Sequence, residues 1–224
     1  MQRLPEPDLM DDKAQARAYA QADFTEPHDN FIRLFQAQWP GRIIRGRVVD
    51  LGCGAADISI RFARAFPGCE IDGIDGANAM LAFGIKAVAA AGLSKRIDLI
   101  HSYLPDDELM AASYDAVISN SLLHHLNDPM TLWHAVRACT SPDNVAGIPV
   151  FIMDLMRPEN ETEVSRLVEQ YVADEPEILR HDFQNSLFAA YTVDEVRAQL
   201  TAAGLDSLTV EAVSDRHLIV AGLL

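Results

Sequence analysis

One short stretch, residues 48–57 (VVDLGCGAAD), constrains the fold more than any other. Its first four residues are apolar apart from Asp50, which is typical of a strand buried on both faces of a parallel sheet. Gly52 and Gly54 interrupt this strand, and apolar residues then recur at helical spacing until Pro67. A strand, a glycine turn and a helix in this order open a nucleotide-binding α/β fold. The glycines permit close approach of a ligand, and the helix N-terminus offers free N–H groups.

The acidic residues of the glycine loop bear on whether it binds a dinucleotide or a ligand with a cationic end. The dinucleotide fingerprint G-x-G-x-x-G places a pyrophosphate at the helix N-terminus, but here Asp57 occupies the third glycine position. Carboxylates at Asp50 and Asp57 suit a ligand with a cationic end better than a diphosphate. A nicotinamide-dependent oxidoreductase therefore stays only as an alternative. The run Val-Val-Asp-Leu-Gly-Cys-Gly closely resembles motif I of the class I S-adenosylmethionine-dependent methyltransferases, whose cofactor has an amino group and a sulfonium.

An acidic residue, Asp75, ends the second predicted strand, residues 69–75. It follows the glycine loop by about twenty residues, where nucleotide-binding βαβ units place an acid that receives ribose hydroxyls. A carboxylate can accept two such hydrogen bonds at once, and the methyltransferase family also has an acid here. The resemblance implies S-adenosyl-L-methionine as the cofactor. The cofactor-binding residues that we predict are Asp50, Gly52, Cys53, Gly54, Asp75, Gly76, Tyr103, Asn120, Ser121 and Tyr19.

Several aromatic residues have two open interpretations. The family commonly has a small residue and an Asp after the third strand, residues 97–101, but this chain has Ser102 and Tyr103. Tyr103 either stacks on the adenine or points into the core. The helical leader before residue 45 resembles family segments that lie over the cofactor. Tyr19, Phe24 and Phe31 in it are predicted either to line such a lid or to pack in the core.

Two adjacent histidines, His124 and His125, follow the fourth predicted strand, residues 114–120, in a segment that resembles the family's motif IV. Asp128 and Pro129 then predict the start of a helix. Consecutive side chains point in different directions, and no acidic or cysteine residue has ligand spacing, so we predict no metal. We expect one histidine to face the cofactor and the other the core, with the order open.

Methyl transfer from a sulfonium is an in-line displacement that depends mainly on alignment of the reacting atoms and exclusion of water. A general base is needed only when the acceptor carries a proton that must leave. The candidate bases, all near predicted strand ends, are His125, Asp154 and His217.

A long segment, residues 155–191, separates the fifth predicted strand, residues 148–153, from the next helix. Its apolar periodicity predicts two helices, which form either a substrate lid or a structural hairpin. Arg157, Arg180 and His181 in this segment are predicted to hold an anionic acceptor, or else to pair with nearby surface acids. The predicted function is methyl transfer to a small anionic metabolite. The alternatives are the oxidoreductase above and an S-adenosylmethionine-binding protein with other chemistry.

The closing part contains a capping box, Thr192 to Glu195, and two strands, residues 205–213 and 218–223, whose short connection predicts an antiparallel hairpin. The resemblance covers residues 45–223 and implies a doubly wound α/β fold. Its seven-stranded sheet is mostly parallel, with an antiparallel last strand. We predict a single domain, residues 1–224, in four parts. These are a helical leader (1–44), a cofactor-binding half (45–154), the lid (155–191), and a closing helix and hairpin (192–224).

Composition limits the partners. The 224 residues suit one domain, and the net charge of −15 disfavours DNA or RNA as substrate. The three cysteines have neither metal nor disulfide spacing, so we predict a cytoplasmic protein. The N-terminus lacks an apolar signal core, residues 1–12 are expected to form a loose arm, and the longest apolar run is too short to span a bilayer. We predict a small-molecule substrate and no membrane partner, and we make no prediction of oligomeric state.

Overall fold

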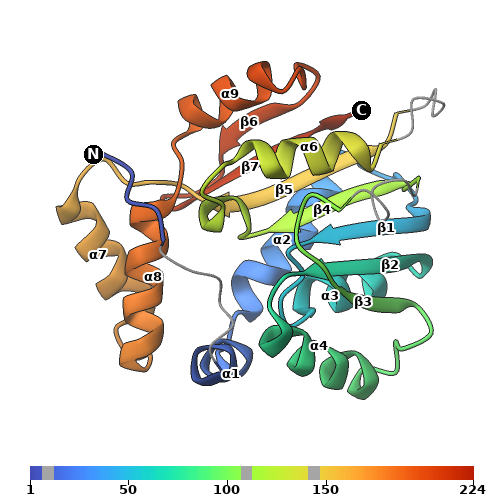
Figure 1. Cartoon of the computed structure of the whole chain (residues 1–224), viewed down its shortest axis with the longest axis horizontal. Coiled ribbons are helices and arrows are strands. Elements are labelled where there is room, and N and C mark those ends of the chain that lie inside the picture. The colour runs from blue at the N-terminus through green and yellow to red at the C-terminus, as the bar shows by residue number, and fades with distance from the viewer. Residues whose placement is uncertain (7–12, 107–112, 141–146) are drawn as a thin grey trace.

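The computed structural model describes residues 1–6, 13–106, 113–140 and 147–224. One seven-stranded sheet with the order β3-β2-β1-β4-β5-β7-β6 runs through the molecule (Figure 1). β7 is antiparallel to both neighbours, and the other pairings are parallel, which confirms the predicted fold class. The strands are β1 (Arg45–Leu51), β2 (Gly68–Asp75), β3 (Ile97–His101), β4 (Ala116–Asn120), β5 (Pro149–Leu155), β6 (Thr209–Ala212) and β7 (His217–Leu223).

Helices cover both faces of the sheet. The helical elements are α1 (Lys13–Gln21), α2 (Thr25–Gln38), α3 (Asp57–Ala65), α4 (Asn78–Ala90), the short η1 (Leu123–His125), α6 (Met130–Ala138), α7 (Glu161–Val172), α8 (Glu177–Ala189) and α9 (Val193–Ala202). On one face, the α2 and α3 side chains Phe35 and Phe62 pack with Phe151 of β5. On the other face, α6 and α9 pack Trp133 and Leu200 against alternate strand residues. The period of two along the strands therefore divides the core into two layers.

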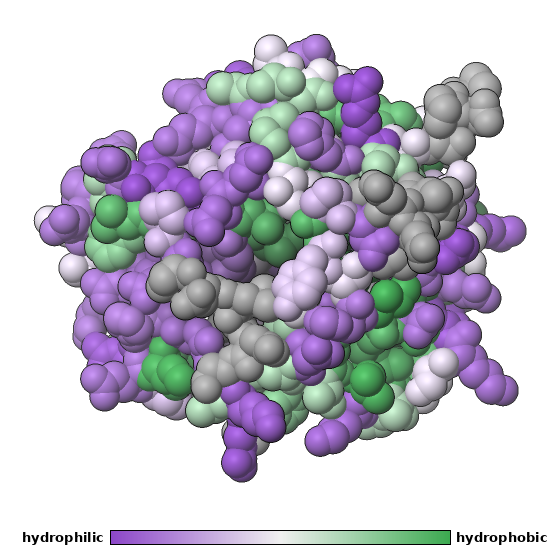
Figure 2. Space-filling model, in the orientation of Figure 1, coloured by the Kyte–Doolittle hydropathy of each residue, from purple (hydrophilic) through white to green (hydrophobic). Residues whose placement is uncertain are grey.

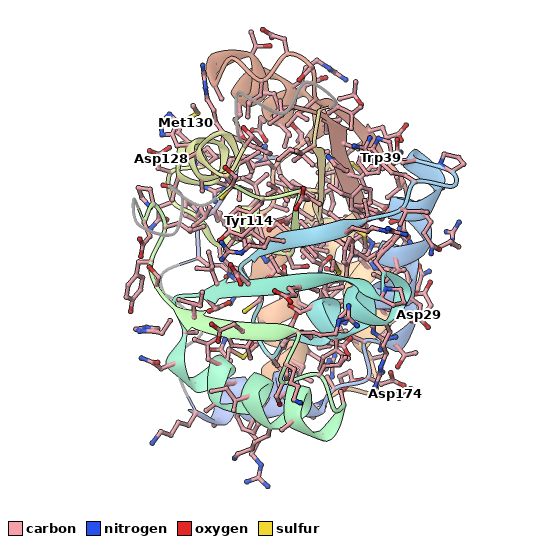
Figure 3. The ribbon with its side chains drawn as sticks, turned by 90° about the vertical axis from the view of Figure 1, so that its right-hand side faces the viewer. Asp29, Trp39, Tyr114, Asp128, Met130 and Asp174 are labelled. Carbon is pink, nitrogen blue, oxygen red and sulfur yellow. The ribbon has the colours of Figure 1, made fainter. Side chains whose placement is uncertain are left out.

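The start of α6 bears out one local prediction. Asp128 Oδ1 accepts the N–H of Met130 at 2.9 Å, and both side chains lie at the beginning of this helix (Figure 3). The predicted capping box is also present, because Thr192 and Glu195 exchange hydrogen bonds at the start of α9.

Two strands are longer than the hydrophobic pattern indicates. β1 begins at Arg45, because its polar first residues pair with β2 through the backbone. β5 continues to Leu155, so Asp154 lies inside the strand, and it is only 1% exposed. Ladder hydrogen bonds use main-chain groups, so strand ends do not follow side-chain polarity.

The N-terminus corrects a second expectation. Residues 1–6, which we call the N-terminal strap, are anchored rather than loose. Arg3 donates to Ala189 O at 2.6 Å and to His124 O at 3.0 Å, and its guanidinium lies 4.1 Å from the Tyr191 ring centroid. Leu4 N donates to Phe188 O at 3.0 Å. Residues 7–12 of the predicted arm lie outside the described residues.

The carboxyl ends of β1, β4 and β5 point to the side of the molecule where α1 and α8 lie (Figure 1). Hydrophilic side chains cover most of the face seen in Figure 2, with apolar ones in separate patches. Among the described residues, no helix combines the length and apolarity needed to cross a bilayer.

Candidate functional site

A cavity of about 700 Å³ lies at the carboxyl ends of β1, β2 and β4. This is the edge where doubly wound sheets bind ligands, and the volume suits a small molecule. The cavity is lined by strap, leader, glycine-loop, α4 and η1 residues. They include Glu6, Tyr19, Phe24, His28, Asp50, Gly52, Cys53, Gly54, Asp57, Arg61, Asp75, Met80, Phe83, Tyr103, Asn120, Ser121, Leu122, His125 and Leu126.

The glycine loop turns the chain sharply between β1 and α3. Gly52 has φ +74° and Gly54 has φ +54°, a region that residues with a Cβ rarely adopt. A Cβ on Gly52 would lie 2.9 Å from Cβ of Leu122, which is closer than van der Waals contact allows. Ser121, at the end of β4, also has a positive φ of 58°, and such strained residues cluster at functional sites. The loop backbone is thus held close to the cavity.

Two buried oxygen atoms in the cavity wall have no hydrogen-bond partner among the described residues: Oδ1 of Asp50 and Oδ1 of Asn120. The other oxygen of Asp50 accepts the Ser59 hydroxyl at 2.5 Å. Burial raises the pKa of Asp50 to about 7, although the Ser59 hydrogen bond acts in the opposite direction. Buried acceptors without partners are costly, so a ligand with N–H donors and positive charge would satisfy both.

Asp75 connects the end of β2 to the loop. Its Oδ2 accepts the N–H of Gly54 at 2.8 Å, and its Oδ1 accepts the N–H of Ala77 at 2.7 Å. Burial raises the pKa of Asp75 above its ordinary value, while these two N–H groups lower it. Each oxygen keeps a free lone pair, so the carboxylate can still accept two ligand hydroxyls.

Asp57 does not have the role that the sequence suggested. Its Oδ2 is 2.6 Å from Nδ1 of His28 and accepts Nε of Arg61 at 2.7 Å. The carboxylate that we expected to favour a cationic ligand therefore already has two partners. It ties α2 to the first turn of α3, whereas Asp50 keeps a buried oxygen without a partner among the described residues.

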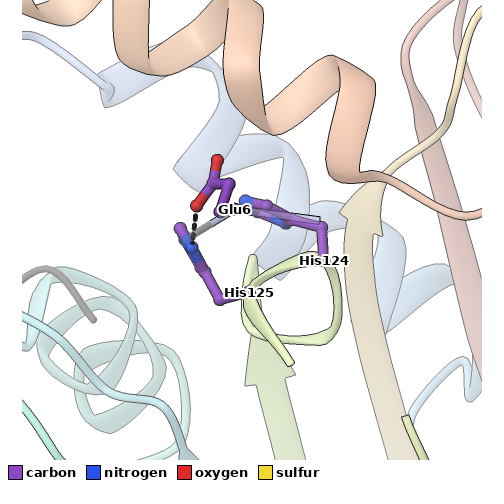
Figure 4. Close-up of side chains that lie close together, drawn as sticks. All are labelled: Glu6, His124 and His125. Atoms are coloured by element: carbon purple, nitrogen blue, oxygen red, sulfur yellow. Dashed lines mark ion pairs between the residues drawn. The ribbon is translucent and has the colours of Figure 1, made fainter. Parts of the chain in front are cut away.

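The order of the adjacent histidines is resolved. His125 lines the cavity, whereas His124 is buried and its Nδ1 lies 2.6 Å from Oδ1 of Asp154. Burial lowers the pKa of His124, but the neighbouring Asp154 carboxylate outweighs burial and leaves the pKa raised. Nδ1 of His125 lies 2.5 Å from Oε2 of Glu6 (Figure 4). This contact has the distance of an ion pair without the angles of a hydrogen bond.

The other two candidate bases do not line the cavity. Oδ1 of Asp154 lies 2.6 Å from Nδ1 of His124, and its Oδ2 accepts the N–H of Leu123 at 2.7 Å. His217, at the start of β7, is near Ser214, and burial lowers its pKa to about 4, helped by Arg216. Gly76 is also absent from the lining, and its carbonyl faces the ring of His101 at 3.0 Å.

The three predicted substrate-binding cations also lie outside the cavity lining. Arg157 is buried, where it donates to Ala190 O at 3.0 Å and to Glu195 at 2.6 Å. Arg180 and His181 are exposed on α8. None of residues 155–191 lines the cavity, because α7 and α8 bury their apolar faces on each other. Two residues of the predicted lid contact residues that line the cavity: Ser186 donates to Glu6 at 2.7 Å, and the Tyr191 hydroxyl donates to Leu126 O at 3.3 Å.

The structure shows which of the predicted aromatic residues line the cavity and which pack in the core. Tyr19 and Phe24 line the cavity, with ring centroids 4.6 Å apart. Burial and nearby carboxylates raise the pKa of Tyr19 to about 12, so its hydroxyl stays protonated. Phe31 is fully buried against Phe151, so it is a core residue. Tyr103 lines the cavity and is 62% exposed, which rules out the core position.

Sequence reasoning missed Glu6 entirely. It is 119 positions from His125, inside a segment without apolar periodicity, so no local pattern indicates the contact. Glu6, His124 and His125 each present a ligand-type atom within 4.8 Å of the others. Internal partners already engage both Glu6 oxygens and both Nδ1 atoms. The prediction of no metal therefore stays a prediction. It rests on ligand spacing along the chain, which does not detect an acid as distant in sequence as Glu6.

The chain is similar to known methyltransferases in sequence and in fold. The family model described as a methyltransferase domain matches residues 49–146. An uncharacterized methyltransferase of Mycobacterium tuberculosis is 27% identical over 110 residues, which cover 49% of this chain and 53% of that protein. The chain thus spans about half the length of the curated relatives that it matches.

Solved structures share the fold along nearly the whole chain. A SAM-dependent methyltransferase from Aquifex aeolicus matches with a TM-score of 0.63 and 17% identity, covering 95% of this chain and 98% of that one. Phosphoethanolamine N-methyltransferase 2 of Haemonchus contortus, in complex with S-adenosyl-L-methionine, has a TM-score of 0.66 and 12% identity. That match covers 95% of this chain and 57% of the other.

Proposed function

We propose that this chain, which belongs to the class I S-adenosylmethionine-dependent methyltransferases, binds S-adenosyl-L-methionine in the cavity and transfers its methyl group to a small molecule. When bound, the cofactor supplies a methyl group activated by a positively charged sulfur. The observation that carries the proposal concerns two buried oxygens beside the glycine loop, one of Asp50 and one of Asn120, which have no hydrogen-bond partner in the described part of the chain. The oxidoreductase alternative has no comparable support, since Asp57 blocks the dinucleotide fingerprint.

The residues present fit this cofactor. Asp75 would receive the ribose hydroxyls, and the two buried oxygens of Asp50 and Asn120 suit the cationic amino-acid end. Tyr103 and Phe83 offer flat apolar surface for an adenine ring. Gly52 and Gly54 would let the backbone approach the ligand, because neither has a side chain to fill the space. The protein then acts by orientation and by excluding water.

The acceptor that we propose is a small molecule that enters neutral or cationic. The anionic acceptor favoured by the sequence would meet none of Arg157, Arg180 and His181 in the cavity. Of the charged groups in its wall, the arginine, Arg61, already pairs with Asp57 and Asp29. The remaining charges are mainly carboxylates, which disfavour an anion. Three free, buried cysteines support the proposed cytoplasmic location.

The direct test is a titration of S-adenosyl-L-methionine into wild type and Asp75→Ala by calorimetry. Loss of charge-assisted hydrogen bonds to the ribose should cost about 1.5–3 kcal/mol, or roughly ten- to a hundredfold in affinity. Asp72→Ala is the matched control, because Asp72 lies on the same strand but bonds Tyr114 and Arg47 outside the cavity. Unchanged affinity in a folded Asp75→Ala protein would reject the assignment.

Cofactor binding should also release a proton near neutral pH. The pKa of Asp50 is about 7 because the carboxyl is buried, so roughly half of it is protonated there. A cationic ligand favours the carboxylate and lowers this pKa, which should release about half a proton at pH 7. Calorimetry in phosphate and Tris buffers measures the release. Asp50→Asn should abolish it, and an equal release from that variant would show that Asp50 is not the source.

A further inference from the structure

We propose that the N-terminal strap completes the active site: its Glu6 positions His125 as the general base, so the methyl acceptor carries a transferable O–H or N–H proton. This inference rests on the proposed function and names the acceptor class. It also assigns a functional part to a segment that the sequence predicted to be loose. Glu6 is a positioning residue, and His125 is the group that would touch the acceptor.

The Glu6 carboxylate lies between Ser186 and His125. Glu6 Oε1 accepts the Ser186 hydroxyl at 2.7 Å, and Oε2 lies 2.5 Å from Nδ1 of His125. Nδ1 is buried and makes no hydrogen bond elsewhere among the described residues. A carboxylate at Nδ1 favours the tautomer with its proton there, which leaves the lone pair on Nε2. Such catalytic contacts are often poorly aligned without ligand and tighten when substrate binds.

The strap holds Glu6 in place through several independent contacts. Arg3 donates to the carbonyls of Ala189, His124 and Leu126, and it stacks on Tyr191. Two of these carbonyls flank His125 in the chain, so the strap binds the same turn that carries the base. Together with Ser186 of α8, these contacts fix a carboxylate that the local sequence around η1 does not provide.

The groups facing His125 come from four elements. Glu6 lies on the strap, and His124 stacks on His125 with ring centroids 4.0 Å apart. Asp154 of β5 holds His124, and Asp75 of β2 interacts electrostatically with His125. Carboxylates therefore dominate, with the Arg3 guanidinium near His124 as the opposing charge.

The proposed reaction couples methyl transfer to the transfer of one proton. A lone pair on the acceptor oxygen or nitrogen forms the new bond to the methyl carbon, and the carbon–sulfur bond breaks with its electron pair remaining on sulfur. The acceptor proton passes to Nε2 of His125, and the resulting imidazolium is paired with Glu6. Although burial raises the pKa of Glu6, His125 outweighs it and the value falls to about 2, so this carboxylate is charged throughout the working range. A carboxylate acceptor has no proton to lose and would need neither residue.

The first experiment needs no acceptor. Histidine-labelled protein saturated with S-adenosylhomocysteine is examined by ¹⁵N NMR, with the His125 signal assigned by its loss in His125→Gln. In wild type the neutral ring should carry its proton on Nδ1, and Glu6→Ala should shift it towards Nε2. Identical tautomers in the two proteins would overturn the proposal. Calorimetry with the same ligand separates the two claims, since failure of wild type to bind it rejects the proposed function instead.

The second experiment uses tritiated S-adenosyl-L-methionine with a panel of small alcohols, phenols, amines and carboxylic acids. For the member methylated fastest, His125→Gln should lower kcat about 10²–10⁴-fold without changing cofactor affinity. Glu6→Gln removes a negative charge beside the base, so the acidic limb of the pH–rate profile should move about 1–3 units lower. Arg3→Ala, which loosens the strap without altering Glu6 or His125, should show a smaller shift in the same direction.

Glu163→Gln is the matched control, because it makes the same chemical change in an exposed pair with Arg166 on α7. It should leave the profile in place. A carboxylic acid turned over equally by wild type and His125→Gln would overturn the proposal. So would a stoichiometric Zn²⁺ ion held by Glu6, His124 and His125, because the metal would take the imidazole lone pair that a general base needs.

Discussion

Replacing Asp154 by alanine is expected to lower the free energy of unfolding by about 3–5 kcal/mol, because it breaks a buried pair and leaves the other partner without compensation. The side chains of Asp154 and His124 are only 1% and 3% exposed. Asp154 also accepts the backbone N–H of Leu123, which would be left buried and unsatisfied. Urea unfolding of wild type and variant measures the loss. The contacts of Asp154 thus anchor η1 to β5.

The same pair predicts the direction of a pH effect. The pKa of His124 in the folded protein is raised above its ordinary 6.5, with Asp154 overcoming the effect of burial. The pair's contribution is therefore fully present below pH 6.5 and is lost as the pH rises through the higher folded value. Asp154→Ala should lack this part of the pH dependence. Asp194→Ala, which removes an exposed partner of Arg197, should cost only about 0.5 kcal/mol. Equal losses from the two variants would contradict the burial argument.

Gly52→Val is expected to abolish measurable cofactor binding, with affinity falling more than about a hundredfold, equivalent to over roughly 2.7 kcal/mol. The added Cβ would lie 2.9 Å from two side-chain carbons of Leu122, in a wall of the cavity. The backbone also has φ +74°, where a β-branched residue is strained. The loop would have to move, and this movement would break the hydrogen bond from the N–H of Gly54 to Asp75. Calorimetry with S-adenosylhomocysteine provides the measurement.

Gly41→Val distinguishes the effect of backbone strain at positive φ from the effect of an added Cβ that meets neighbouring atoms. Gly41 has φ +76°, almost the same as Gly52, but no atom of the described residues lies within 4 Å of an added Cβ. Its substitution should cost about 1–3 kcal/mol of stability and leave cofactor affinity unchanged. If Gly52→Val unfolds the protein, Gly52→Ala supplies the smaller change for the same comparison. Wild-type affinity in a folded Gly52→Ala protein would show that the loop does not need close approach to the ligand.

The short-range features of this protein could be predicted from its sequence. The glycine loop, Asp75 and the Thr192–Glu195 capping box each depend on residues within one turn or one βαβ unit, where spacing along the chain fixes spacing in space. The sheet followed from the family resemblance together with the order of apolar segments. Tyr103 had two open positions, because strand parity alone does not say which way a side chain turns after the strand ends.

Only the tertiary structure decided which distant groups meet. Glu6 reaches His125 because the strap crosses α8 and η1, and Arg157, which follows β5, pairs with Glu195 of α9 and does not line the cavity. A charged side chain carries no periodic signal of its own, so its partner depends on how separate elements pack. For this protein the sequence determined the cofactor loop and the layered α/β fold. Packing at the carboxyl ends of the strands decided which acids and histidines share the site.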